Sequence, residues 1–212
     1  MRTIVFISQK GGCGKSTLAA CLAVAAQEAG ERVFILDMDP KKSLARWGVK
    51  RKDCNPPVRA VSSANLPAAI STLSKRDVSL VVVDTPALES PASLSALKAA
   101  NLSIVPARPS TFDIWASEVT GRKLKLMDKE FVFLLNQCPR ARQASHIQEG
   151  IAALEAIGKL FRPYIRARAA FQDAARTGKG VTEVDPKGEA AREMRALWLA
   201  LNRRLPPSQA RR

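Results

Sequence analysis

The 212-residue sequence predicts an α/β fold with a doubly wound, mainly parallel sheet and helices on both faces. Apolar runs recur at regular intervals, and segments rich in Ala, Leu, Lys and Glu fill the gaps between them. The runs at 78–84 and 131–135 are nearly continuous in apolar residues rather than alternating. Such runs are typical of strands that are buried on both faces of a parallel sheet.

The elements follow from these patterns in chain order. We expect strands over residues 3–8, 32–37, 58–61, 78–84, 102–107, 130–136 and 163–168. We expect helices over residues 15–29, 66–74, 90–100, 114–127, 145–157 and 188–204. The proline-rich stretches between them are too short for interdomain linkers, so residues 1–205 are expected to form one domain and residues 206–212 a disordered basic tail.

The charge is strongly positive and uneven. The chain has 34 Lys and Arg against 19 Asp and Glu, a net charge of +15, and residues 159–212 hold thirteen basic and five acidic residues. This asymmetry predicts a polyanionic partner, either nucleic acid or an acidic membrane surface, and a charge that only favours solubility is the alternative. No apolar stretch is long enough for a membrane span or a signal peptide, which predicts a cytoplasmic protein.

Cysteine and histidine form no catalytic or metal-binding pattern. The four cysteines include no C-x-x-C pair, so we expect neither a zinc site nor a disulfide framework. The single histidine, His146, lies in a polar stretch and is expected at the surface.

A glycine-rich loop between the first strand and the first helix reads K-G-G-C-G-K-S-T from Lys10 to Thr17. Its glycines, Gly11, Gly12 and Gly14, allow backbone N–H groups to point toward a phosphate chain at the positive end of the following helix. The loop therefore predicts nucleotide binding, with the P-loop type of α/β fold.

The side chains of the loop have separate expected tasks. Lys15 is expected to reach the β- and γ-phosphates, Ser16 to ligate Mg²⁺ and Thr17 to bond to the α-phosphate. Cys13 occupies the variable position of the nucleotide-binding loop, and its thiol is assigned no chemistry. Because Gln9 stands where the pattern G-x-x-x-x-G-K-[ST] has glycine, the sequence fits the narrower form K-G-G-x-G-K-[ST].

Acidic residues follow two of the expected strands. Asp84 closes the most apolar run, where a carboxylate is unfavourable unless it faces a metal or a metal-bound water, so we interpret it as the Walker-B acid. A strand-terminal capping aspartate is the alternative. Alternation places Asp37 and Asp39 on one side of an extended chain, and one of them is expected to position the attacking water. An Asp-Pro turn explains the same spacing.

Three segments together resemble the ParA/MinD family of deviant-Walker P-loop ATPases: residues 10–17, D-M-D-P at 37–40 and D-T-P at 84–86. The short length, S-L-A-R-W at 43–47 and R-P-S-T-F-D at 108–113 are most similar to the small ParF-type plasmid partition ATPases. The resemblance covers nearly the whole chain and is strongest before residue 115.

The resemblance implies a role for each residue of the site. Lys10 would reach across a dimer interface to the partner's nucleotide, Asp39 would activate water, Asp84 would hold Mg²⁺ through water, and Asn136 would contact adenine. Lys41 departs from the family, which usually has glutamine there. The related nitrogenase iron protein also has lysine at this point, so ATP hydrolysis remains the expectation.

The implied function is an ATP-dependent sandwich dimer on the nucleoid that binds DNA nonspecifically. A small centromere-binding or adaptor protein would stimulate its slow hydrolysis of ATP, and the cargo stays open among plasmid, chromosome, carboxysome and other complexes. The candidate DNA-binding residues are the basic side chains Arg162, Arg166, Arg168, Arg176, Lys179, Arg192 and Arg195.

A MinD-like, membrane-associated regulator is the alternative function. Leu197, Trp198, Leu201 and Leu205 recur at helical spacing with arginines between them, as in a helix that lies on a membrane. A last helix that packs its leucines on the sheet shows the same stripe. A metabolic kinase is not supported, because the sequence has no recognisable motif for an acceptor substrate.

Overall fold

The computed structural model describes residues 1–139 and 144–207, without the side chains of residues 144–147. The side chain of His146 and residues 208–212 lie outside the described part. The surface position of the histidine, the domain boundary at residue 205 and the disordered tail therefore stay predictions.

A seven-stranded sheet has the order β3-β2-β4-β1-β5-β6-β7, and each strand pair in the described residues is parallel. The expected doubly wound parallel sheet is confirmed, with β1 between β4 and β5 at its centre. The strands are β1 (Arg2–Ser8), β2 (Val33–Asp37), β3 (Val58–Ala60), β4 (Leu80–Ala87), β5 (Leu102–Ala107), β6 (Phe131–Leu135) and β7 (Lys159–Phe161).

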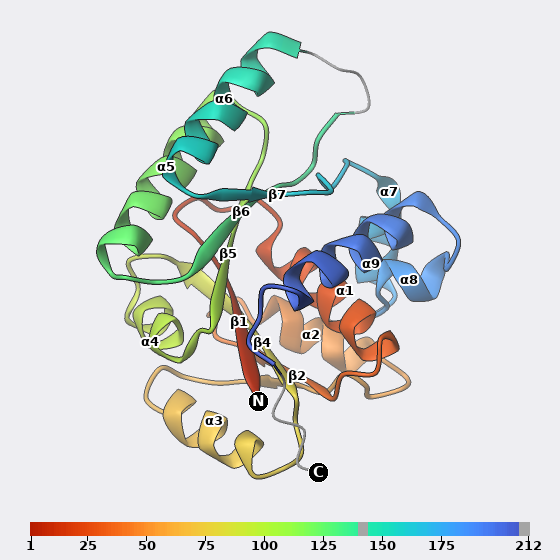
Figure 1. Cartoon of the computed structure of the whole chain (residues 1–212). Helices are drawn as coiled ribbons and strands as arrows, with labels where there is room; N and C mark the ends of the chain where they lie inside the picture. The colour runs from red at the N-terminus through yellow and green to blue at the C-terminus, as the bar shows by residue number, and fades with distance from the viewer. Residues whose placement is uncertain (140–143, 208–212) are drawn as a thin grey trace.

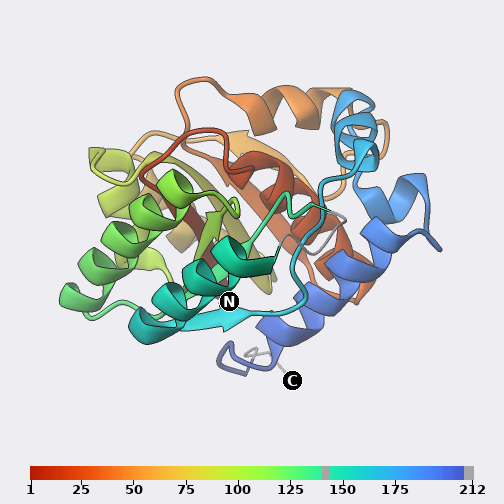
Figure 2. The same ribbon diagram turned by 90° about the horizontal axis from the view of Figure 1, so that it is seen from above.

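Helices cover both faces of the sheet, as Figures 1 and 2 show. One layer contains α1 (Lys15–Glu28), α2 (Ser43–Lys50), α7 (Ala169–Arg176), α8 (Val181–Val184) and α9 (Glu189–Asn202). The other layer contains α3 (Leu66–Ser74), α4 (Pro91–Ala99), α5 (Thr111–Leu126) and α6 (Ala144–Ile157).

The central strands bury side chains on both faces. Ile4 and Phe6 of β1 belong to the core cluster under α1 and α9, whereas Val5 and Ile7 belong to the cluster under α4 and α5. Because successive side chains of a strand point to opposite faces, an apolar residue is needed at each position. This double burial explains the continuous apolar runs in the sequence.

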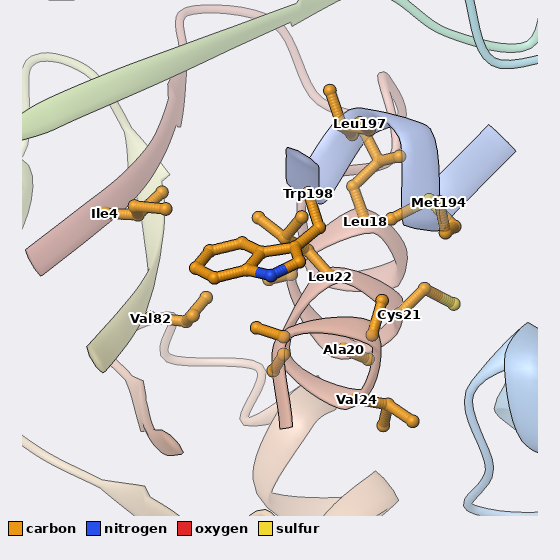
Figure 3. Close-up of a cluster of buried hydrophobic side chains, with 14 of the residues drawn as sticks. Ile4, Leu18, Ala20, Cys21, Leu22, Val24, Val82, Met194, Leu197 and Trp198 are labelled. Atoms are coloured by element: carbon orange, nitrogen blue, oxygen red, sulfur yellow. The ribbon is translucent and has the colours of Figure 1, made fainter. Parts of the chain in front are cut away.

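Helix α9 packs its apolar stripe into the core. Leu197, Trp198 and Leu201 are buried, and Figure 3 shows the Trp198 indole between α1 and the sheet, near Leu22 and Val82. The stripe that sequence reasoning left open between membrane and core therefore belongs to the core in this structure. Within the described residues, no helix combines the length and the apolar character needed to cross a membrane.

The last third of the chain differs from the sequence prediction. The strand expected at 163–168 is wrong: the described residues there form only a single bridge, between Cys138 and Arg166, and the seventh strand is β7. Pro163 has no N–H to donate to a sheet ladder, which disfavours strand pairing at the start of that segment. The short helices α2, α7 and α8 were not predicted; they have four to eight residues, and each is shorter than every helix that was predicted.

Candidate nucleotide-binding site

The phosphate loop connects β1 to α1 at the carboxyl edge of the sheet. Gly12 and Gly14 have φ angles of 81° and 93°, a conformation that residues with a Cβ rarely adopt. A Cβ on Gly14 would also lie 2.3 Å from Nδ2 of Asn136. The two glycines are therefore needed for the conformation of the loop, and Gly14 is also needed for the close approach of Asn136.

Lys15 lies folded over the loop. Its Nζ donates to Oγ of Ser8 at 2.9 Å, and that hydroxyl donates in turn to the carbonyl oxygen of Lys10 at 2.8 Å. Ser8 Oγ also lies 3.1 Å from Sγ of Cys13. The Lys15 ammonium group thus faces the concave side of the loop, where phosphates are expected.

Lys10 has a different partner. Its Nζ lies 3.1 Å from Oδ2 of Asp113 and 5.8 Å from the ring centre of Phe112, and its side chain is 40% exposed. Asp113 is buried and also accepts hydrogen bonds from Arg108 Nε at 3.0 Å and from Ser110 Oγ at 2.5 Å. Although burial raises it, these hydrogen bonds hold the pKa of Asp113 below its ordinary value. Asp113 therefore holds Lys10 outside the loop that Lys15 occupies.

Asp84 lies inside β4, level with Asp37 on the neighbouring β2. Its Oδ2 accepts from Ser16 Oγ at 2.5 Å, and its buried Oδ1 has no hydrogen-bond partner. Burial and the charges of Asp37 and Asp39 raise the pKa of Asp84 to about 7, against the opposing effects of Ser16 and Lys15. A buried carboxylate oxygen without a partner, next to a hydroxyl, fits a hydrated divalent cation.

The length of β4 argues against the alternative interpretation of Asp84 as an aspartate that caps the end of a strand. Because β4 continues to Ala87, Asp84 does not end the strand, as a capping aspartate would. In the described part of the chain, no group of three or more His, Cys, Asp and Glu side chains is placed to hold a metal ion. A Mg²⁺ ion near Ser16 and Asp84 would therefore take its other ligands from water and phosphate oxygens, which is usual for Mg²⁺ beside nucleotides.

Asp37 and Asp39 have different surroundings. Asp37 is buried and accepts from the backbone N–H groups of Asp39 at 3.0 Å and Ala45 at 2.9 Å. Asp39 is half-buried and begins a turn, in which its carboxylate accepts from the N–H of Lys41 at 2.8 Å. The expected extended chain is therefore wrong beyond Asp37, since the Asp-Pro turn forms. Asp39 is the one of the two whose carboxylate is accessible.

A pocket of about 560 Å³ opens beside the loop, a volume within the range of small-molecule sites. Its walls include Thr17, Asn136, Gln137, Arg166 and Phe171. The amide Nδ2 of Asn136 donates to the carbonyl oxygen of residue 13 at 2.8 Å, and Nε2 of Gln137 donates to that of residue 12 at 3.1 Å. The structure places Asn136 at the candidate base pocket, and its contact with adenine stays a prediction.

The seven basic residues proposed to bind DNA lie on different elements and have different partners. Arg166 and Arg168 line the pocket beside the loop, and Arg168 is paired with Glu193 at 2.7 Å. Arg176 and Lys179 flank the turn after α7, whereas Arg192 and Arg195 belong to α9. Arg162 lies against the ring of Tyr164, and Arg195 pairs with Glu28 at 3.0 Å.

Sequence reasoning missed Ser8, Asp113 and Gln137. The segment that contains Asp113 entered only as part of a resemblance, although it directly follows β5 at the edge where ligands bind in parallel sheets. Gln137 follows β6 in the same way. Their position at or after the ends of predicted strands was the sequence signal that could have identified them.

Comparison with known proteins supports this site. Residues 4–181 match the family model described as the CobQ/CobB/MinD/ParA nucleotide binding domain. The protein named maintenance of carboxysome distribution protein A of Halothiobacillus neapolitanus is 28% identical over 199 residues, which is 89% of this chain and 90% of that protein. Its namesake in Gloeobacter kilaueensis is 32% identical over 204 residues, or 92% and 89% of the two chains.

Solved structures confirm the fold. The MinC:MinD complex of Aquifex aeolicus gives a TM-score of 0.79 at 17% identity, covering 99% of each chain. MinD of Pyrococcus horikoshii complexed with Mg-ADP gives 0.75 at 20% identity, over 95% of this chain and 96% of that one. The ATP complex of a Cyanothece McdA variant gives 0.75 at 18% identity, with the same coverage. The expected cofactors, ATP and Mg²⁺, are thus confirmed for relatives of this fold.

Proposed function

Because the chain belongs to the CobQ/CobB/MinD/ParA nucleotide-binding family, we propose that it is a partner-stimulated ATPase that positions a large cargo in the cell. In this proposal the ATP-bound chain forms a sandwich dimer, and the dimer binds nucleoid DNA without sequence preference in the cytoplasm. Hydrolysis of ATP by water gives ADP and phosphate and returns the chain to a form that leaves DNA.

The observation that carries the proposal is the different placement of the two lysines of one loop. Lys15 faces the inside of the loop through Ser8, so it serves the phosphates bound by its own chain. Lys10 lies outside the loop beside Asp113 and is partly exposed, so it is accessible to a second chain. A second lysine of this kind is not needed for nucleotide binding within one chain, which favours a role in a dimer.

The residues around Asp84 fit the metal that accompanies the nucleotide. Ser16 Oγ and the unpaired Oδ1 of Asp84 would hold Mg²⁺, directly for the hydroxyl and through water for the carboxylate. When bound, Mg²⁺ neutralises charge on the phosphate oxygens during phosphoryl transfer. Asp37 supports this arrangement by fixing the turn after β2 through its two backbone hydrogen bonds.

Asp39 is the group proposed to orient the attacking water. It is accessible, whereas Asp37 uses both oxygens on backbone N–H groups. A carboxylate that orients water beside the γ-phosphate supplies the function that phosphoryl transfer most needs from the protein. Lys41, which donates its backbone N–H to Asp39, holds this carboxylate at the start of the turn.

The burial of α9 favours DNA over a membrane as the surface that the protein uses. Leu197, Trp198, Leu201 and Leu205 have at most 6% of their surface exposed, so the apolar stripe of a membrane-bound helix is not accessible. The net charge of +15 comes from Lys and Arg side chains, and exposed basic side chains attract the phosphate backbone of DNA.

The most specific part of the proposal concerns the identity of the cargo and of the adaptor protein. Two similar proteins are named for the maintenance of carboxysome distribution, which supports a large protein assembly as the cargo. The ParF-like motifs fit a plasmid, and the same motor serves either cargo. In both cases a small cargo-bound protein would stimulate hydrolysis.

A DNA-binding titration in three nucleotide states tests the proposal. We expect the affinity for random-sequence duplex DNA to rise sharply with ATP, and to be weak with ADP or without nucleotide. Because each contacted phosphate releases counterions, log affinity should fall with log salt at a slope of about −0.9 per contact. Equal, weak affinity in the three states would contradict the proposal, and binding to anionic vesicles instead would favour the membrane alternative.

A further inference from the structure

A basic face lies over the helix that follows the phosphate loop, and two segments far apart in the sequence form it. Residues 41–52 carry six Lys and Arg and no acidic residue. Helix α2 lies within this segment, and the turn at 176–180 lies against it. We call the exposed basic side chains of helix α2 itself and of this turn the α2 face; they are Arg46, Lys50, Arg176 and Lys179.

Direct hydrogen bonds join helix α2 to the turn. Nε1 of Trp47 donates to the carbonyl oxygen of Lys179 at 3.2 Å, and Nζ of Lys50 donates to that of Arg176 at 3.3 Å. The buried guanidinium group of Arg51 donates to the carbonyl oxygen of Gly178 at 2.9 Å. Figure 2 shows the end of α2 near α7, where Lys50 contacts Arg176, and both helices belong to the layer that contains α1. The basic side chains of the two segments therefore belong to one surface.

The first turn of α2 is attached to the candidate nucleotide site. The backbone N–H of Ala45 donates to Oδ2 of Asp37 at 2.9 Å, and Asp37 lies level with Asp84 on the next strand. A hollow of about 200 Å³ beneath the face is lined by Ser16 and Thr17 of the phosphate loop together with Arg46 and Lys50. One short helix thus contacts the end of β2 beside the candidate nucleotide site with its first turn, and the basic turn with its last turn.

The chemistry of the face fits a nucleic-acid backbone. Its acidic neighbours are few: Asp173 lies 3.6 Å from Arg176, and Glu183 is paired with the buried Arg51. The bulky apolar side chains of α2, Leu44 and Trp47, are buried, so they are not available to insert into a membrane. Among the described residues of α2, the exposed large apolar side chain is Val49, which offers no aromatic anchor of the kind that protein interfaces use.

We propose that the α2 face binds the phosphate backbone of duplex DNA, and that α2 couples this face to the nucleotide site. The inference rests on the proposed function and adds Arg46 and Lys50 of α2, which sequence reasoning did not include, to two of the candidates after residue 159. A shift of the turn that contains Asp39 would move Asp37 and the first turn of α2. The hydrogen bonds of Trp47 and Arg51 would then carry that movement to the basic turn.

A double substitution on α2 with a matched control tests the face. We would measure the affinity of Arg46→Ala/Lys50→Ala for a fluorescent random-sequence duplex by anisotropy, with a non-hydrolysable ATP analogue and across a salt series. The control, Arg122→Ala/Lys125→Ala, removes the same charge from exposed positions of α5 on the other face of the sheet. Calorimetry with the analogue shows whether nucleotide binding is intact.

We expect the α2 variant to lose about tenfold or more in DNA affinity and its salt slope to become shallower by about two units, about 0.9 per lost phosphate contact. The control should change DNA affinity less than about twofold, because surface charges away from the contact act only weakly through salt. An unchanged affinity and slope in the α2 variant, with wild type still binding DNA, would overturn the α2 face and leave the proposed function intact. A wild-type chain without ATP-dependent DNA binding would instead contradict the proposed function. Loss of binding to phosphatidylserine vesicles alone would show that the face serves a membrane and overturn the inference.

A third variant tests the coupling. Trp47→Phe keeps an aromatic ring in the core but removes the hydrogen bond to Lys179. We expect it to reduce the ratio of DNA affinities with the ATP analogue and with ADP, while calorimetric nucleotide affinity stays unchanged. A purely structural role would lower both DNA affinities equally and leave their ratio intact, and that result would overturn the coupling. Thermal denaturation checks that the variant is folded.

Discussion

At the scale of single residues, the phosphate loop separates two lysines that the sequence places five positions apart. Lys15 donates to Ser8 inside the loop, and Lys10 donates to the buried Asp113 outside it. Arg108 also pairs with Asp113, so this carboxylate keeps a cationic partner if Lys10 leaves. Lys10 can therefore be released toward another chain without leaving an unpaired charge in the protein.

Lys15→Ala is expected to weaken ATP binding by about 100-fold, because a hydrogen bond to a charged group contributes about 1.5–3 kcal/mol. Titration calorimetry with ATP and Mg²⁺ measures this change. Lys125→Ala, at an exposed position on α5, is the control and should bind ATP as wild type does. Unchanged ATP affinity in Lys15→Ala would show that the loop is not the nucleotide site.

Asp39→Ala is expected to keep ATP affinity and to lower the turnover number by about 10²–10⁴-fold, the usual contribution of a general base. Release of phosphate measures turnover, and calorimetry measures binding. Asp53→Ala removes an exposed carboxylate beyond α2 and serves as the control. If Asp39→Ala hydrolysed ATP at the wild-type rate, another group would have to position the water.

The residues of the phosphate loop could be predicted from sequence because they are consecutive in the chain and form a recognisable motif. The motif from Lys10 to Thr17 is specific for nucleotide phosphates. Asp84 was noticeable because it is a carboxylate in an otherwise apolar strand. The partners of the loop could not be predicted in the same way. Ser8 and Asp113 act through hydrogen bonds that depend on the rotamers of long side chains and on the register of neighbouring strands. Neither is visible in a one-dimensional pattern.

At the scale of elements, strongly periodic segments were predictable and short ones were not. The strand at 102–107 and the helix at 66–74 match the structure to the residue, because a polar or charged residue stands directly before and after each apolar pattern. Helix α2 contains Gly48 and Trp47 within eight residues, which gives a low helix propensity. It forms because Asp37 accepts from its first turn and because Trp47 docks on the turn after α7. Such tertiary causes cannot be predicted from local sequence.

Trp198→Ala on α9 is expected to destabilise the protein by about 3–5 kcal/mol, the usual cost of removing a large buried aromatic side chain. The indole is 2% exposed and packs between α1 and the sheet (Figure 3). Denaturant unfolding of the wild type and the variant measures the difference. Leu199→Ala, at a 55% exposed position of the same helix, should change stability by less than about 0.5 kcal/mol. Equal effects of the two substitutions would mean that α9 is not docked as described.

The Arg51–Glu183 pair connects the end of α2 to α8 and should make this connection sensitive to acid. Burial raises the pKa of Glu183, but the hydrogen bonds from Arg51 and from the Gly180 N–H outweigh it, and the pKa is lowered overall. The unfolded chain therefore binds this proton more readily than the folded chain does. The stability that the pair contributes is full above the ordinary pKa of a glutamate and is lost as the pH falls through the lowered pKa.

Glu183→Gln is accordingly expected to be less stable than the wild type at neutral pH, with a difference that shrinks between about pH 5 and pH 3 as the wild-type carboxylate is protonated. Denaturant unfolding across this range measures the difference. Glu89→Gln, in an exposed pair with Lys123, is the control and should show little loss at any pH. A stability difference that stays constant with pH would mean that the charge of Glu183 does not support α8.

At the scale of the whole molecule, formation of the proposed dimer has to overcome electrostatic repulsion. Two chains that each carry a net charge of +15 repel each other, and the repulsion falls when phosphates are placed between them. The surface beside Lys10 also offers apolar contact, because Phe112 and Trp115 at the start of α5 are 71% and 57% exposed. Phe112 lies 5.8 Å from Nζ of Lys10, so the apolar and the charged parts of this surface are continuous.

A ligand shifts an equilibrium between monomer and dimer only through contacts that differ between the two states. In the proposed function Lys15 would contact the phosphates of its own chain in both states, so it would not favour the dimer. In the proposed dimer, Lys10 would gain a phosphate partner that it lacks in the monomer and would give up its hydrogen bond to Asp113. The preference of ATP for the dimer should therefore depend on Lys10.

Lys10→Ala is expected to bind ATP as a monomer, with an affinity within about threefold of the wild-type monomer, since less than 0.7 kcal/mol separates two such affinities. Light scattering of the wild type and the variant, with ATP, ADP and no nucleotide, measures the assembly, and calorimetry confirms that the variant is loaded with ATP. Lys52→Ala removes an exposed charge away from Asp113 and should dimerise as the wild type does. If Lys10→Ala still formed an ATP-dependent dimer, the hydrogen bond between Lys10 and Asp113 would have only a structural role. The placement of two lysines in one loop would then no longer indicate a second chain.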